Sequence, residues 1–198
     1  MKAVAICGSR HAGGNTEHLL KHALARLKRL GIEGALVPML WKKVFPCRGC
    51  GACATRKNGT CVIEGDDFAA LFKSMREADV LLIGGPVDPG AAPPDLKTLL
   101  ERACCVSRAS GNLFSRKIGA PVAVVSKEPS RHSLQRLLTW FPVQNMIVPG
   151  ALGYPLVKGR DGIASGVAIQ ADAGGEAVME SLAENLAWLA GKTATSSP

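Results

Sequence analysis

Aromatic residues are scarce in this chain of 198 residues, which holds five phenylalanines, three tryptophans and a single tyrosine. Proteins that bind single-stranded nucleic acid stack the bases on aromatic side chains, so the scarcity argues against that class. The net charge of +8 would suit an anionic partner, yet the basic residues are scattered and no helix-turn-helix pattern is present. We therefore expect no nucleic-acid partner and attribute the charge to anionic small molecules or an acidic protein.

Long apolar runs are absent too, since no stretch approaches the roughly 18 residues that a membrane span requires. The first apolar run, Lys2–Cys7, is too short for a secretory signal, and the polar run Gly8–Arg10 follows at once. These absences predict a cytoplasmic protein with no membrane partner. In that compartment clustered cysteines more often bind metal or take part in redox chemistry than form structural disulfides. The length predicts one domain over residues 1–192, with a frayed tail at 193–198.

Short apolar runs alternate with amphipathic helical patterns along the chain, which predicts an α/β fold. We interpret these runs as buried strands at residues 2–7, 33–38, 79–84, 120–126 and 145–149. Because strands alternate with helices, we expect a doubly wound five-stranded parallel sheet with helices on both faces. A cysteine-rich insertion at 41–65 interrupts the alternation after the second strand. In such folds, ligands bind at the carboxyl ends of the strands.

The first predicted strand runs directly into a glycine-rich turn, and a helix follows. Free backbone N–H groups and the helix dipole attract an anion at such a helix start. The side chains of Ser9, Asn15 and Thr16 can donate further hydrogen bonds to a terminal phosphate, although the turn lacks the G-x-G-x-x-G pattern of dinucleotide sites. The turn therefore predicts a phosphate site with Asn15 or Thr16 as the helix cap, and the alternative is an ordinary strand-to-helix turn.

Four of the seven cysteines fall in one short segment with the spacing C-x2-C-x2-C-x7-C, namely Cys47, Cys50, Cys53 and Cys61. The glycines between them let the backbone fold back and direct the sulfurs towards one centre. A C-x2-C-x2-C run is the ligand pattern of bacterial iron–sulfur proteins, whereas zinc ribbons use two C-x2-C pairs with a long spacer. Basic neighbours favour thiolates and a cluster of negative charge. The segment predicts an iron–sulfur cluster, and the alternatives are a zinc site or a loop of free or redox-active thiols.

The other cysteines and a pair of histidines carry no such signal. Cys7 ends a buried strand and Cys104 lies on the apolar face of a helix, so we expect both in the core. Cys105 points elsewhere, and neither it nor Cys104 has ligand spacing to the clustered four. His18 and His22 are four residues apart on the polar face of a helix, where we expect them to be solvated rather than to bind metal.

Taken together, these residues resemble the flavodoxin-like family of NAD(P)H-dependent FMN reductases, and within it the iron–sulfur flavoproteins. The resemblance covers nearly the whole chain. It is carried by Gly8–Thr16, Pro46–Cys61, Asp66–Phe68, Ala78-Asp79, Pro86-Val87, Leu96-Lys97 and Glu101-Arg102. It implies a flavodoxin-like fold and an oxidoreductase activity.

The resemblance also implies two cofactors. The FMN phosphate would lie on Ser9, Gly14, Asn15 and Thr16, with Arg10 or His11 within reach, and the flavin ring near Pro86, Val87, Asp88 and Gly90. A [4Fe–4S] cluster would lie near the flavin, often across a dimer interface, on Cys47, Cys50, Cys53 and Cys61. The flavin exchanges two electrons and the cluster one, so the pair would interconvert two-electron and one-electron steps. The implied partners are NAD(P)H or ferredoxin as electron donor, a redox partner protein, and further copies of the chain in a dimer or tetramer.

Three departures from the family pattern bear on the function. His11 stands where the family usually has arginine, and Arg10 precedes it. Asp88 replaces an aromatic residue, and its carboxylate would disfavour an anionic reduced flavin. Residues 126–131 are bulkier than the usual glycine-rich segment that packs on the ring. The leading interpretation is an FMN-dependent oxidoreductase coupled to a cluster. The alternatives are a cluster-free NAD(P)H-dependent FMN or quinone reductase, and a non-catalytic metal- or cluster-binding protein that has lost its flavin.

Overall fold

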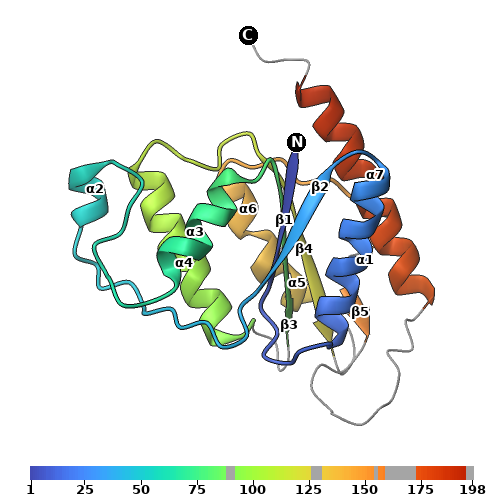
Figure 1. Ribbon diagram of the computed structural model, residues 1–198, viewed down its shortest axis with the longest axis horizontal. Coiled ribbons are helices and arrows are strands. Elements are labelled where there is room, and N and C mark those ends of the chain that lie inside the picture. The colour runs from blue at the N-terminus through green and yellow to red at the C-terminus, as the bar shows by residue number, and fades with distance from the viewer. Residues whose placement is uncertain (88–91, 126–130, 154–155, 159–172, 195–198) are drawn as a thin grey trace.

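The computed structural model describes residues 1–87, 92–125, 131–153, 156–158 and 173–194 (Figure 1). Its parallel strands form one sheet in the order β2-β1-β3-β4-β5, which confirms the predicted doubly wound α/β fold. The strands are β1 (Lys2–Cys7), β2 (Glu33–Pro38), β3 (Val80–Pro86), β4 (Ile118–Val125) and β5 (Leu156–Lys158). The helices are α1 (Asn15–Arg29), α2 (Ala52–Arg56), α3 (Phe68–Glu77), α4 (Pro94–Ala109), α5 (Arg131–Leu138), α6 (Trp140–Val143) and α7 (Ala173–Ala194).

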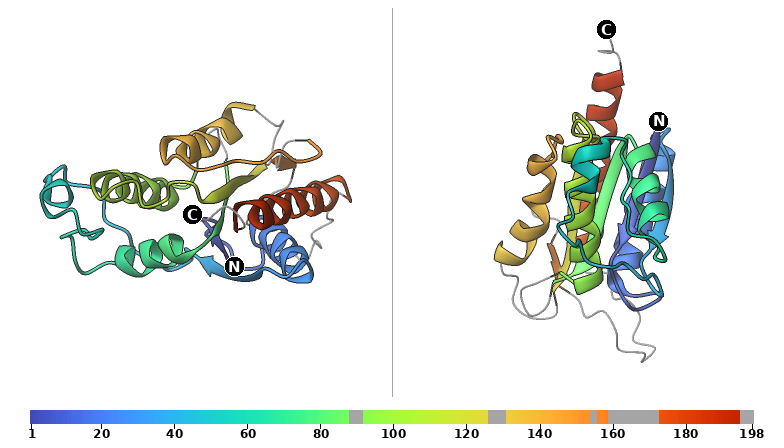
Figure 2. Two further views of the ribbon diagram at one scale, coloured as in Figure 1. Left: turned by 90° about the horizontal axis from the view of Figure 1, so that it is seen from above. Right: turned by 90° about the vertical axis from the view of Figure 1, so that its left-hand side faces the viewer.

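The two faces of the sheet are covered by different helices (Figure 2). Along β1, Ala3, Ala5 and Cys7 pack in the core that α1 and α7 close. The intervening Val4 and Ile6 pack in the core that α3, α4 and α6 close. Successive side chains of a strand point to opposite faces, and here both faces are buried. That is why the strand is one continuous apolar run rather than an alternating one, and why Cys7 is a core residue as predicted.

The last strand of the sheet lies later in the chain than predicted. Residues 145–149, all of which the structure describes, make one isolated bridge, from Ile147 to Ile118. The strand β5 instead pairs with β4 at residues 156–158. The earlier run is apolar because Met146 is buried in the core. Its backbone does not extend because Asn145 has a left-handed φ of 57°.

Helix ends differ from the sequence prediction in two places. Gly14 occupies the N-cap position of α1, so Asn15 and Thr16 lie inside the helix. The prediction that one of them caps the helix is therefore wrong. At the other end of the chain, α7 continues to Ala194 and thus includes the first two residues of the predicted tail. Residues 195–198 lie outside the described part. Of the helices that the structure describes, none is long and apolar enough to cross a membrane.

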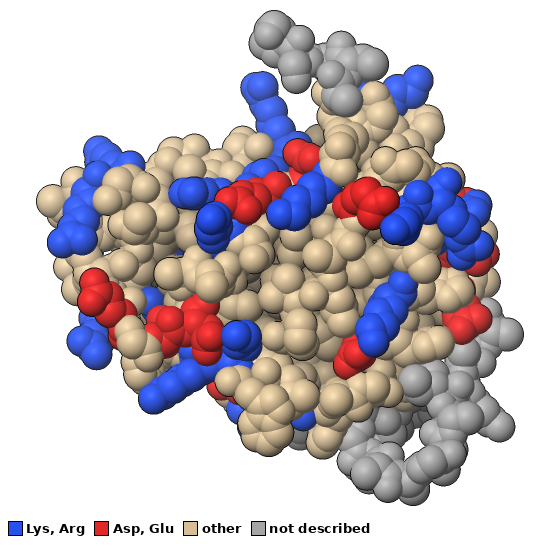
Figure 3. Space-filling view, in the orientation of Figure 1, with Lys and Arg blue, Asp and Glu red and all other residues tan. Residues whose placement is uncertain are grey.

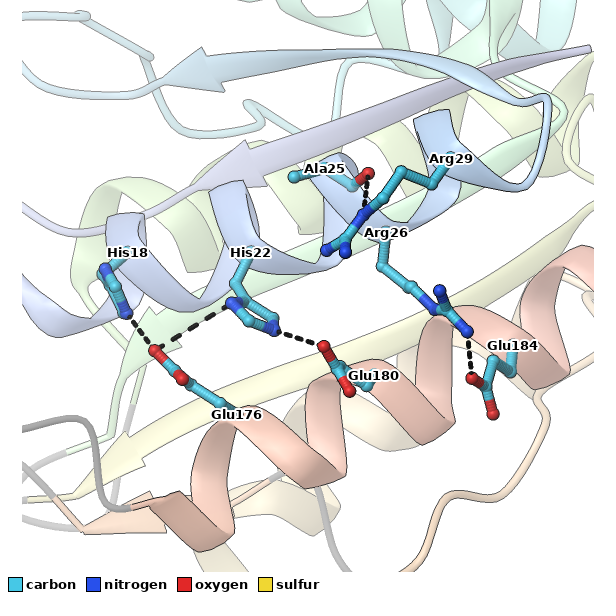
Figure 4. Close-up of polar contacts among 8 residues, drawn as sticks. All are labelled: His18, His22, Ala25, Arg26, Arg29, Glu176, Glu180 and Glu184. Carbon is cyan, nitrogen blue, oxygen red and sulfur yellow. Dashed lines mark hydrogen bonds and ion pairs between the residues drawn. The ribbon is translucent and has the colours of Figure 1, made fainter.

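A row of ion pairs joins α1 to α7 and corrects the prediction for the polar face of α1 (Figure 4). Each of three basic side chains on α1 meets a glutamate of α7, in the pairs His18–Glu176 (2.9 Å), His22–Glu180 (3.4 Å) and Arg26–Glu184 (2.5 Å). The two histidine side chains are only 34% and 20% exposed and are paired with glutamates. The prediction that they are solvated is therefore wrong. The spacing of four residues on both helices aligns the pairs, but α1 alone does not reveal its partner helix.

We expect Glu176→Gln to lower the melting temperature by about 1–3 °C at neutral pH, in keeping with an exposed ion pair. The hydrogen bond from His18 lowers the pKa of Glu176 below its ordinary value of 4.5. A carboxylate with a lowered pKa stabilises the fold above its ordinary pKa, and this contribution is lost as the pH falls through the lowered value. The difference in thermal unfolding should therefore be largest at pH 7 and shrink as the pH is lowered below 4.5. Glu64→Gln, at an exposed position, is the control, and a difference that stays undiminished in acid would contradict the assignment.

Candidate functional site

The loops after β1 and β3 meet where the strand order of the sheet reverses. β1 pairs with β2 on one side and with β3 on the other, so the chain leaves β1 and β3 towards opposite halves of the sheet. Ligands of open α/β sheets bind in the crevice at this position. The carboxyl ends of β1 and β3 lie at the lower edge of the sheet in Figure 1. Asp88 and Gly90, which the sequence places there, lie outside the described residues, as do residues 126–130.

The loop after β1 buries polar groups at the start of α1. Ser9 is 2% exposed and Thr16 is fully buried, while Asn15 between loop and helix is half-buried. The hydroxyl of Ser9 accepts a hydrogen bond from the backbone N–H of His11 at 3.1 Å, which tightens the turn. Hydroxyl groups at the start of a helix are donors that an anion site can use. The predicted phosphate residues are thus held together in one turn.

A carboxylate already occupies part of this turn. Glu17 accepts a hydrogen bond from the backbone N–H of Gly13 at 2.8 Å and pairs with Lys21 at 2.6 Å. The hydrogen bond from Lys21, and then the one from Gly13, lower the pKa of Glu17. A phosphate that binds the same N–H group must displace this carboxylate. The acidic residue in the first helical turn was the available signal, and the sequence prediction missed it.

Arg10 ties the turn to a second element. Its Nη2 and Nε atoms donate to Asp95 Oδ2 at 2.6 Å and 3.2 Å, and Asp95 lies in the first turn of α4. Arg10 was predicted to reach the phosphate, whereas the structure engages it with this carboxylate. The exposed His11 is the other basic side chain of the turn. Arg10 therefore fixes the turn against α4, and a phosphate contact would require it to leave Asp95.

All four cysteines of the predicted cluster line one pocket that opens to solvent. We call residues 47–61 the cysteine segment. Gly49 and Gly51 have φ values of 64° and 70°, which are left-handed conformations that turn the chain between the cysteines, as predicted. Val62, Ile63 and Val106 make apolar parts of the wall. Within the described residues no three His, Cys, Asp or Glu side chains already form a metal-ligating group, so the thiols surround the pocket without converging.

Cys105, on α4, is a residue of this pocket that the sequence prediction missed. The Cys53 thiol lies 3.9 Å from its carbonyl oxygen, and Cys47 lines the same pocket. Burial, and then the neighbouring thiol of Cys47, raise the pKa of Cys105 to about 11. Cys104 was predicted to lie in the core, but it is only half-buried. The only signal for Cys105 was its position three residues after Arg102, which places both on one helix face.

Arg102 anchors the cysteine segment to α4. Its guanidinium donates to the carbonyl oxygens of Phe45 at 2.9 Å and Ile63 at 3.3 Å, which flank the segment on either side. It also forms an ion pair with Asp66, and both side chains are 1% exposed. The Nε atom is buried without a hydrogen-bond partner among the described residues, and Arg102 lines the pocket. One buried cation thus fixes both ends of the segment.

The phosphate turn and the cysteine pocket lie at opposite ends of α4 (Figure 1). Asp95, which holds the turn, is in the first turn of the helix, and Cys105 follows ten residues later. At the rise of an α-helix, ten residues span about 15 Å. The two candidate sites are therefore separate places on one rigid helix.

On the face that Figure 3 shows, Lys and Arg side chains are interspersed with Asp and Glu and form no continuous basic stripe.

Comparisons with known proteins agree with this geometry. The family model described as NADPH-dependent FMN reductase matches residues 1–161. An iron-sulfur flavoprotein of Methanosarcina thermophila is 34% identical over 152 residues, which are 76% of this chain and 78% of that protein. RosB, solved with a bound 8-demethyl-8-formylriboflavin-5'-phosphate intermediate, matches with a TM-score of 0.72 over 99% of this chain and 81% of that one, at 15% identity. A WrbA-like flavodoxin from Agrobacterium tumefaciens matches with a TM-score of 0.62 over 96% of this chain and 98% of that one, at 12% identity. The two structures establish a flavodoxin-like fold.

Proposed function

The chain belongs to the family of NADPH-dependent FMN reductases, and on this basis we propose that it is an FMN-dependent oxidoreductase that couples its flavin to a [4Fe–4S] cluster. The family membership inferred from the sequence motifs is confirmed. One observation carries the proposal of a second redox centre: the four predicted cysteine ligands line a single pocket on a flavodoxin-like domain. Soft thiolate donors in this number suit an iron–sulfur cluster.

For the flavin, the residues of the β1 turn supply the binding groups. Ser9, Asn15 and Thr16 would donate to the phosphate at the start of α1, where Glu17 would give up the Gly13 N–H. The flavin ring would lie against the carboxyl end of β3, close to Pro86 and to positions 88 and 90. FMN, when bound, exchanges electrons in pairs or singly. The protein would position it at the start of α1, where the side chains of Ser9 and Thr16 are buried.

For the cluster, the chain offers donors, a shaped wall and hydrogen bonds. Cys47, Cys50, Cys53 and Cys61 would be its ligands after their side chains turn inward. The N–H of Gly49 already donates to the sulfur of Cys47 at 3.5 Å. The unpartnered Nε–H of Arg102 is a further donor at the pocket. Hydrogen bonds to sulfur tune the potential of such a cluster, which supplies one-electron transfer when bound.

The proposal has three further parts. The electron donor is NAD(P)H or ferredoxin, a redox partner protein takes part, and the chain assembles into a dimer or tetramer. The separation of about 15 Å along α4 between turn and pocket supports assembly. A second copy of the chain can place its flavin beside this pocket, whereas one chain holds the two centres at opposite ends of a rigid helix.

The absence of a converged thiol group among the described residues favours the alternative, a cluster-free NAD(P)H-dependent FMN or quinone reductase.

The content of iron, acid-labile sulfide, zinc and FMN, measured on one sample purified without oxygen, tests the proposal. We expect about four irons, about four sulfides and about one FMN per chain, as a [4Fe–4S] flavoprotein requires. FMN without iron would overturn the cluster and leave the simple flavin reductase. Zinc in place of iron, or a preparation that holds no FMN and binds none when it is added, would overturn the coupled flavoprotein altogether.

A further inference from the structure

The cysteine pocket is lined by five thiols, one more than a [4Fe–4S] cluster needs. Four of them belong to the cysteine segment, and their side chains are exposed or half-buried. The fifth, Cys105, belongs to α4, where its neighbours Ala103 and Val106 are 0% and 2% exposed and pack in the core. The extra thiol thus stands on the fixed wall of the pocket, opposite a loop that carries the others.

Cys105 shares its pocket with the quartet, and one member acts on it most strongly. Both Cys105 and Cys47 line the pocket, and the Cys53 thiol lies 3.9 Å from the carbonyl oxygen of Cys105. Among the neighbouring thiols, that of Cys47 has the largest effect on the pKa of Cys105. Arg102 holds both flanks of the cysteine segment against α4, so this neighbourhood is set by buried contacts. A thiol that lines the same pocket as a ligand thiol can reach the same iron after a small movement.

We propose that Cys105 is an alternative ligand of the iron–sulfur cluster, which takes the iron position of Cys47 when the Cys47 thiolate is absent. This inference rests on the proposed cluster. The step is a ligand substitution without electron transfer: the iron–sulfur bond to Cys47 is replaced by one to Cys105, whose thiol releases its proton to solvent on binding. The alternative ligand set is then Cys50, Cys53, Cys61 and Cys105.

Cys104 provides a matched control on the same helix. It is adjacent to Cys105 and half-buried, but it does not line the pocket. Its removal therefore costs one thiol of the same helical turn without touching the cluster site. Cys50 provides the opposite control, because it lines the pocket but is not among the thiols that raise the pKa of Cys105.

Iron and sulfide content of oxygen-free preparations tests the proposal. The variants are Cys47→Ala, Cys50→Ala and the doubles Cys47→Ala/Cys105→Ala and Cys47→Ala/Cys104→Ala. We expect Cys47→Ala to keep about three to four irons per chain and Cys50→Ala to fall below about one. The double with Cys105 should fall to the level of Cys50→Ala, whereas the double with Cys104 should match Cys47→Ala. Retained FMN shows that each variant is folded.

Alkylation of the native proteins gives a second readout. Mass spectrometry of the labelled thiols should show Cys105 accessible in the iron-loaded wild type and protected in Cys47→Ala. If the wild type holds iron and Cys47→Ala is as bare as Cys50→Ala, with Cys105 labelled in both, the alternative ligand is overturned and the cluster stands. A wild type that holds no iron overturns the cluster and this inference together.

Discussion

Replacing Arg102 by methionine is expected to lower the free energy of unfolding by about 3–5 kcal/mol, the usual cost of breaking a buried ion pair. The side chains of Arg102 and Asp66 are both 1% exposed, so the variant leaves a carboxylate buried without its cation. The carbonyl oxygens of Phe45 and Ile63 lose their donors as well. Chemical denaturation measures the loss. Limited proteolysis should also show faster cleavage after Arg56 and Lys57, because the cysteine segment is released.

Two companion variants separate this effect from a general loss of charge. Arg108→Met removes an exposed arginine of the same helix and should change the free energy of unfolding by less than about 0.5 kcal/mol. Arg102→Met/Asp66→Asn removes the uncompensated charge and should recover part of the stability, because the orphaned carboxylate causes much of the cost. If Arg102→Met unfolds within about 1 kcal/mol of the wild type, the buried pair does not anchor the segment.

The residues around Asp66 show how far sequence reasoning reached. Asp66 precedes the helix that begins at Phe68, and its Oδ1 accepts the N–H of Phe68 at 3.2 Å, although Asp67 occupies the N-cap position. That contact is local, so the order of residues reveals it. Its Oδ2 accepts hydrogen bonds from Arg102 and, at 2.8 Å, from the backbone N–H of Phe45. Both residues are distant from Asp66 in the chain. Contacts of this kind depend on how elements pack, which periodicity does not report.

The same division explains the other successes and errors. Strands β1 and β3 were predictable because they are buried on both faces and are therefore continuously apolar. The run around Met146 is apolar for another reason, since Met146 packs in the core while the run joins the sheet only through the single bridge of Ile147. Cys105 and the α1 histidines were misjudged because the elements that face them, the cysteine segment and α7, lie elsewhere in the sequence. The residues of the predicted phosphate turn are consecutive, so the sequence shows them together, whereas Asp95, which holds Arg10, lies 85 residues further along the chain.

Thr16→Val is expected to weaken FMN binding by about 10- to 100-fold, while iron content stays unchanged. Thr16 is fully buried in the first turn of α1, where valine preserves the volume but removes the hydroxyl. A hydrogen bond to a charged group such as phosphate contributes about 1.5–3 kcal/mol, and each 1.4 kcal/mol is about tenfold in affinity. Titration of the flavin-free protein with FMN, followed by flavin fluorescence, measures the change.

Thr16→Ser decides whether the hydroxyl or the packing matters at this position. Serine keeps the donor and loses only a methyl group, so its FMN affinity should stay within about threefold of the wild type if the hydroxyl binds phosphate. Equal weakening in both variants would point to packing of α1 against the sheet instead. Wild-type affinity in Thr16→Val would move the phosphate away from this turn. Because the turn and the cysteine pocket lie at opposite ends of α4, loss of flavin here should leave the iron in place, and that separation is what makes the two proposed centres testable one at a time.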